Sequence, residues 1–134
     1  CIRDRELQCL WCIQRHCELY SGLVEEEQAI RLAFSNYETL GVRGGAIVIG
    51  GRVEAFSLRE RLNKDTFVVH IEKANPSIPG LYAVINQQFA QNEGSSYSSY
   101  INREQDLGDG GLKRAKQSYR PAFMVRKFKV GLGT

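Results

Sequence analysis

Two ionisable side chains, His70 and Glu72, stand two residues apart in the alternating stretch 66–73. Because successive side chains of a strand point to opposite faces, we expect His70 and Glu72 to share one face. The opposite face would be apolar, formed by Phe67, Val69 and Ile71. An imidazole and a carboxylate on one face can share a proton path or bind an amine. A half-exposed strand whose polar face is wet or ion-paired would show the same pattern.

A second polar group, the run 102–106, follows a short predicted strand at 97–102. Charged side chains at the carboxyl end of a strand are where open α/β sheets tend to bind ligands. We expect this run, Asn102-Arg103-Glu104-Gln105-Asp106, to bind a ligand there. A loop anchored by salt bridges remains the alternative interpretation.

A lysine, Lys116, falls on the expected inward face of the helix predicted over about 109–118. That face is formed by Leu112, Ala115 and Tyr119. A lysine that faces inward must either extend its amine to solvent or meet an anion. The helix also begins with Gly110 and Gly111, whose amides could receive a phosphate or carboxylate.

The charge is unevenly distributed, although the net charge is only +3. Residues 1–109 hold 11 basic and 15 acidic residues, a net charge of −4, whereas residues 110–134 hold seven basic residues and no acid. This imbalance favours an anionic partner, namely a phosphate-bearing cofactor, RNA or a lipid headgroup. A solvated basic surface is the alternative.

The elements that must position these residues fit into one domain over residues 1–134. A content of 43% hydrophobic and 25% charged residues is typical of a globular domain and excludes a disordered chain or a fibre. No apolar run approaches the roughly 18 residues of a membrane span, and no signal-like segment is present. Because the chain opens on Cys1, we expect it to be the C-terminal part of a longer protein.

All four cysteines lie in or just before the first predicted helix. They are Cys1, Cys9, Cys12 and Cys17. A secreted disulfide scaffold would spread its cysteines along the chain, so a reducing cytoplasm is expected. Cys9, Cys12 and His16 share one helical face, but a structural zinc site draws its ligand pairs from separate turns. We therefore predict buried thiols and no metal site.

Hydrophobic spacing predicts alternating groups of helices and strands in an α+β fold. The helices are 3–20, 23–40, 81–93 and 109–118; the strands are 46–49, 53–58, 66–73, 97–102 and 121–130. In the second helix the core face would be Ile30, Ala33, Phe34, Tyr37 and Leu40, with Gly41 as its C-cap. Gly50-Gly51 would close a β-hairpin between the first two strands.

Two long stretches resemble one known family. The first is Phe67-Val68-Val69-His70-Ile71-Glu72-Lys73-Ala74 with Gly80-Leu81-Tyr82 and Ile85-Asn86-Gln87. The second is Ile101-Asn102-Arg103-Glu104-Gln105-Asp106-Leu107-Gly108 with Gly111-Leu112 and Lys116-Gln117-Ser118-Tyr119-Arg120-Pro121. Over about residues 45–130 the chain resembles the C-terminal domain of phosphatidylglycerol lysyltransferases, in a soluble bacterial branch.

The resemblance implies the acetyltransferase-like (GNAT, acyl-CoA N-acyltransferase) fold, a mixed central sheet with helices on both faces. It also implies transfer of an acyl or aminoacyl group, borne by tRNA or coenzyme A, to an amine or hydroxyl. By this similarity Lys116 would stabilise negative charge at the donor's ester or phosphate. Coenzyme A-dependent members hold the pyrophosphate in a glycine-rich loop. The corresponding stretch here, 75–81, contains two prolines, which supply no amide donors.

The leading hypothesis is therefore an acyltransferase or aminoacyltransferase whose base is Glu72 or His70. Lys116 and Arg103 would hold negative charge, while Asn102, Asp106, Gly80 and Tyr119 would contact substrate. Acyl-CoA or aminoacyl-tRNA would be the donor substrate, and no cofactor is assigned. An upstream domain of the same protein would be a partner. The second hypothesis is a non-catalytic anion- or RNA-binding module that kept the fold.

Overall fold

The computed structural model describes residues 24–97, 99–104, 108, 110–128, 130 and 131. The chain divides into two compact units, Cys1–Glu104 and Gln105–Thr134, and each is described by itself. The predicted first helix with its four cysteines lies outside the described residues, so the thiol prediction stays open. No helix among the described residues is long and apolar enough to cross a membrane.

The first unit is built on a four-stranded mixed sheet in the order β1-β2-β3-β4. Strands β1 (Arg43–Ile49), β2 (Arg52–Arg61) and β3 (Thr66–Ala74) form an antiparallel meander, and β4 (Tyr100–Asn102) runs parallel to β3. The predicted hairpin is confirmed: Gly50 and Gly51 have φ of +57° and +79°, which glycine adopts without steric cost.

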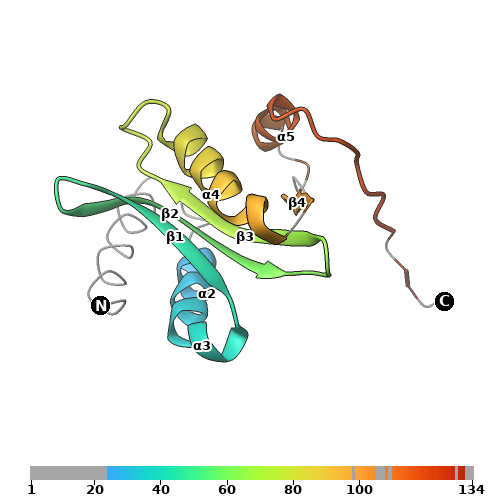
Figure 1. Cartoon of the computed structure of the whole chain (residues 1–134), viewed down its shortest axis with the longest axis horizontal. Helices are drawn as coiled ribbons and strands as arrows, with labels where there is room; N and C mark the ends of the chain where they lie inside the picture. Colours follow the sequence, from blue (N-terminus) through green and yellow to red (C-terminus); the bar gives the residue numbers. More distant parts are fainter. Residues whose placement is uncertain (1–23, 98, 105–107, 109, 129, 132–134) are drawn as a thin grey trace. The chain divides into compact units, whose positions relative to one another are not determined.

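Helices cover both faces of this sheet (Figure 1). On one face, Ile30 of α2 (Val24–Ser35) packs with Val53, Phe56 and Leu58 of β2. On the other, α4 (Leu81–Tyr97) packs Leu81 and Ile85 against small residues of β2 and β3, Ala55 and Ala74. This α+β arrangement confirms the expected acetyltransferase-like fold, with the sheet as a rigid platform for the polar residues of β3 and β4.

Three predicted elements differ from the structure. In the strand expected over 97–102, Tyr97 is the last residue of α4 and only Tyr100–Asn102 form β4. The helix expected over 23–40 is interrupted at Asn36, so α2 is followed by a short helix, α3 (Tyr37–Leu40), which ends as predicted at a left-handed Gly41. Leu40, expected in the core, is 52% exposed. The alternating stretch 121–130 forms no strand in its described residues. Alternation sets only the side-chain pattern, whereas a strand also needs a neighbour to pair with.

A register shift in β3 changes which side chains share a face. Leu58 pairs with Ile71 but Arg59 pairs with Val69, so His70 is the extra residue of a β-bulge. Ile71 consequently packs with the α2 cluster, whereas Phe67 lies under Arg59 on the face covered by α4. The prediction that Phe67 and Ile71 share one apolar face is therefore wrong.

The expectation that His70 and Glu72 share the opposite face is wrong for the same reason. His70 contacts Glu60, which follows Arg59 and lies on the α2 side of the sheet, whereas Glu72 lies between Ile71 and Lys73, which both point to that side, and so faces α4.

Candidate functional site

The residues at the end of β4 contact both predicted site residues of β3, His70 and Glu72, through two separate side chains. The parallel register places Asn102 opposite Val68, and the chain then continues along β3 as Arg103 and Glu104. Both of these side chains contact side chains of β3. We call the group formed by Glu60, His70, Glu72, Asn102, Arg103 and Glu104 the junction cluster.

Glu72 and Arg103 form a two-pronged ion pair within the junction cluster. Arg103 Nη1 donates to Glu72 Oε2 at 3.0 Å, and Arg103 Nη2 donates to Glu72 Oε1 at 2.8 Å. The Glu72 side chain is only 8% exposed. Both oxygens of this carboxylate are therefore committed to a cation in a partly dry position, where such pairs are geometrically specific. This is the ion-paired alternative that the sequence left open for the polar face.

His70 lies between two other carboxylates. Its Nδ1 is 2.8 Å from Glu104 Oε1, and its Nε2 is 3.2 Å from Glu60 Oε1 on β2. The imidazole is 36% exposed, so unlike Glu72 it is open to solvent. The bulge at His70 removes it from regular pairing, which is one way that strands redirect a side chain near a functional site.

Asn102 fixes the backbone that follows β4. Its Oδ1 accepts a hydrogen bond of 2.8 Å from the N–H of Glu104, which has a φ of +54°. Non-glycine residues rarely adopt this left-handed conformation, and those that do often lie at functional sites. The Asn102 amide is thus engaged with its own chain in this structure.

Gly80 lies at the start of α4, after the proline-bearing loop 75–79. Its φ of +78° is a backbone conformation that glycine adopts without strain and other residues rarely adopt. Within the loop, Ser77 N–H donates to Asn75 Oδ1 and Ile78 N–H donates to Asn75 O. The next amide, Leu81 N–H, donates to Ile78 O, so three amides that could face a phosphate are used inside the turn.

Lys116 and Tyr119 belong to the second unit, on and just after α5 (Gly110–Ser118). Lys116 is half-buried, while Lys113 and Arg114 are exposed. The predicted inward stripe is not buried: Leu112 is 41% and Tyr119 is 44% exposed. Asp106 lies outside the described residues, so its role stays a prediction.

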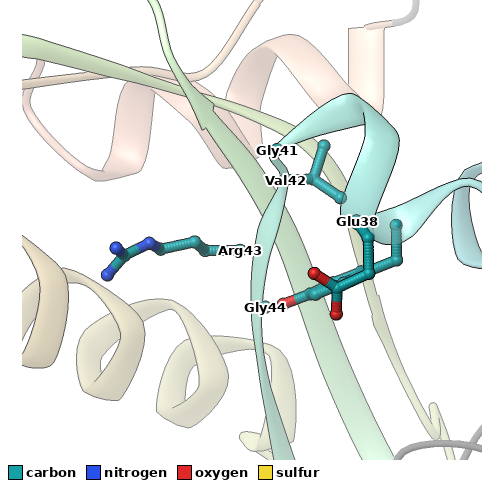
Figure 2. Close-up of a pocket in the computed structure, with 6 residues that line it drawn as sticks. Glu38, Gly41, Val42, Arg43 and Gly44 are labelled. Carbon is teal, nitrogen blue, oxygen red and sulfur yellow. The ribbon is translucent and has the colours of Figure 1, made fainter.

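A hollow of about 490 Å³ lies where α3 meets β1, away from the predicted residues. It is lined by Tyr37, Glu38, Gly41, Val42, Arg43 and Gly44. Figure 2 shows the Arg43 side chain extending away from the Glu38 carboxylate. A widely open hollow without converging polar groups lacks the features of a small-molecule site.

A family model described as phosphatidylglycerol lysyltransferase, C-terminal, matches residues 4–130. The chain belongs to this family. One similar solved structure is a conserved protein of unknown function from Bacteroides thetaiotaomicron VPI-5482, with 41% identity and a TM-score of 0.76. The match covers 90% of this chain but 42% of that one, so the chain spans less than half of its length. A comparison with curated proteins found no match.

Membership of the lysyltransferase family confirms the resemblance expected from residues 45–130.

Three polar residues of this family member were given no role in the prediction from sequence: Glu60, Glu104 and the buried Arg59. The pKa of Arg59 is lowered, mainly by burial and to a smaller extent by the neighbouring Arg43 cation. The Arg59 guanidinium carbon lies 3.7 Å from the centre of the Phe67 ring. Only Glu104 carried a signal in the sequence, as part of the run 102–106. Among the described residues, no group of His, Cys, Asp and Glu is arranged to hold a metal ion.

Proposed function

We propose that this chain is the transferase domain of a phosphatidylglycerol lysyltransferase-like enzyme, which moves an acyl or aminoacyl group to an amine or hydroxyl. The observation that carries the proposal is the family match over residues 4–130. The junction cluster supports it, because a histidine flanked by carboxylates beside a strand end can move a proton.

In the proposed reaction, the acceptor nitrogen or oxygen attacks the carbonyl carbon of the donor ester or thioester. The new C–N or C–O bond forms as the acceptor proton passes to His70 or Glu72. The bond to the tRNA ribose oxygen or the coenzyme sulfur breaks, and that leaving atom takes up a proton. Lys116 and Arg103 stabilise the negative charge that develops on the carbonyl oxygen or the leaving group.

The remaining predicted residues would bind and orient the substrate. Asn102, Asp106, Gly80 and Tyr119 would contact the donor or the acceptor. Arg103 donates two hydrogen bonds to Glu72, which fix the position of its guanidinium beside the strand end.

The loop before α4 favours a tRNA-borne donor over coenzyme A. Its two prolines have no N–H, and the amides of Ser77, Ile78 and Leu81 are used within the turn. Thermal unfolding of the purified chain with acetyl-CoA, free coenzyme A or lysyl-tRNA, at two salt concentrations, tests the proposal. Stabilisation by lysyl-tRNA is the expected result, whereas stabilisation by coenzyme A alone would overturn the assignment of the donor.

A non-catalytic module that binds RNA or another anion is the second candidate. The specific observation in its favour is the run of seven basic residues without an acid in 110–134. Such a module would bind RNA with a steep salt dependence and turn over no donor. Release of the lysyl group from lysyl-tRNA in the presence of an acceptor would exclude it.

An upstream domain of the same protein is a further proposed partner. The similar solved chain is more than twice as long as the region that it shares with this chain. If the donor binds but is not consumed, adding the upstream region is expected to restore turnover.

A further inference from the structure

We propose that Glu104 is a positioning residue that holds His70 in the tautomer of a general base, an inference that rests on the proposed function. The two candidate bases differ in solvent exposure and in the hydrogen bonds that they already make. Glu72 accepts hydrogen bonds at both oxygens from Arg103 and is nearly buried. His70 is the more exposed group, so it is the base of the junction cluster.

The two ring nitrogens of His70 have different neighbours. Glu104 Oε1 is 2.8 Å from Nδ1 in hydrogen-bond geometry, whereas Glu60 Oε1 lies 3.2 Å from Nε2 without the geometry of a hydrogen bond. An ionised carboxylate can only accept, so Nδ1 must carry a proton to bond to Glu104. In the neutral ring this leaves the lone pair on Nε2, the nitrogen that would take the acceptor's proton. In many enzymes a carboxylate accepts a hydrogen bond from one histidine nitrogen, which orients the ring and leaves the lone pair on the other nitrogen to act as the base.

The backbone of Glu104 is held for this contact. Its φ of +54° is uncommon for a side-chain-bearing residue, and the hydrogen bond from its N–H to Asn102 Oδ1 maintains it. On the other side, the bulge in β3 places His70 outside the regular ladder. Two irregularities of the chain, 34 residues apart, therefore meet in one hydrogen bond.

Glu60 has a different place in this arrangement. It is 44% exposed and lies beside Nε2, on the side of the ring where the acceptor would approach. A carboxylate there can bind an acceptor amine in its protonated form before the proton moves. Glu104 thus fixes the ring, and Glu60 faces the substrate.

Nitrogen NMR of the chain labelled at histidine tests the assignment without any activity assay. The sequence has two histidines, and Glu104→Ala is compared with Glu60→Ala, while His70→Gln identifies the His70 signals. At alkaline pH we expect wild-type His70 to carry its proton on Nδ1. This preference should disappear in Glu104→Ala and remain in Glu60→Ala. The same tautomer in all three proteins would overturn the proposal.

The kinetic arm measures lysyl-tRNA consumption with a small primary amine as acceptor. His70→Gln should lower kcat at least about 100-fold. Glu104→Ala should lower kcat by about 10- to 100-fold at unchanged KM, with Glu38→Ala as an exposed control outside the cluster. If Glu104→Ala turns over like wild type, the positioning role is wrong although the transferase stands. If the wild type consumes neither lysyl-tRNA nor acetyl-CoA, alone or with its upstream region added, the proposed function fails, and the tautomer still decides whether Glu104 holds the ring.

If Glu104→Ala does not fold, Glu104→Gln replaces it. The glutamine amide can donate as well as accept, so the His70 tautomer should become mixed. An unchanged Nδ1–H tautomer together with unchanged kcat in Glu104→Gln would overturn the proposal.

Discussion

The junction cluster and the C-terminal basic stretch use charge in opposite ways. In the cluster, every charged group has an oppositely charged or titratable neighbour within 3.2 Å. In residues 110–128, six basic side chains occur with no acidic residue. Charges that neutralise one another fix a geometry, whereas an excess of one sign attracts a partner of the other. We infer that the first region positions the chemistry and that the second recruits an anionic substrate.

The largest expected effect comes from breaking the Glu72–Arg103 pair. Arg103→Ala leaves a carboxylate that is 8% exposed without its two hydrogen bonds, so we expect a loss of about 2–4 kcal/mol in the free energy of unfolding. Arg31→Ala is the matched control, because the side chains of the Arg31–Glu27 pair are more exposed, at 44% and 21%, and this pair should contribute less than about 1 kcal/mol. Urea unfolding measures both. Equal losses in the two variants would show that burial of Glu72 does not strengthen its pair.

The next effect concerns Lys116 in the basic stretch. Lys116→Ala should reduce donor turnover at least about 100-fold without unfolding the chain, because a positioned cation stabilises charge only as the transition state forms. Lys113→Ala, on the exposed side of the same helix, is the control and should keep most of the turnover. Steady-state kinetics and circular dichroism are compared for both. If Lys116→Ala is as active as Lys113→Ala, Lys116 does not stabilise charge in the transition state.

Most of the fold could be predicted from the sequence because its signals are local. The double glycine of the hairpin, the glycine after α3 and the alternation of the strands each depend on a few neighbouring residues. The stretch 121–130 could not be predicted in this way. Its side chains alternate between apolar and polar, but Phe128 is 82% exposed, so the apolar side chains are not buried against a sheet. An alternating pattern does not show whether a neighbouring strand is there to pair with.

The candidate site was predictable only in its composition. His70, Glu72 and Asn102 could be selected by residue type and position. Their contacts could not be predicted, because the Glu72–Arg103 pair joins residues 31 apart and depends on the parallel register of β3 and β4. The bulge that sets His70 apart also depends on two strands at once.

A smaller effect is expected on the binding of RNA by the basic stretch. Replacing Lys113 and Arg114 by glutamine should weaken RNA binding and lower the slope of log K against log salt by about 1 to 2. The stability of the first unit should not change, because neither residue belongs to it. Fluorescence titrations with tRNA over a range of salt measure the slope. A slope equal to that of the wild type would place the anion-binding charge elsewhere.

The smallest effect tests how firmly the junction cluster is held. Asn102→Ala removes the acceptor for the Glu104 N–H and should cost about 1 kcal/mol in unfolding free energy. Asn63→Ala is the matched control, because Asn63 Oδ1 accepts the N–H of Asp65 in an exposed turn at 3.0 Å. In a Glu104→Gly background the backbone adopts a positive φ without strain, so Asn102→Ala should then cost less. A cost that is the same in both backgrounds would mean that Asn102 does not hold Glu104 in its left-handed conformation.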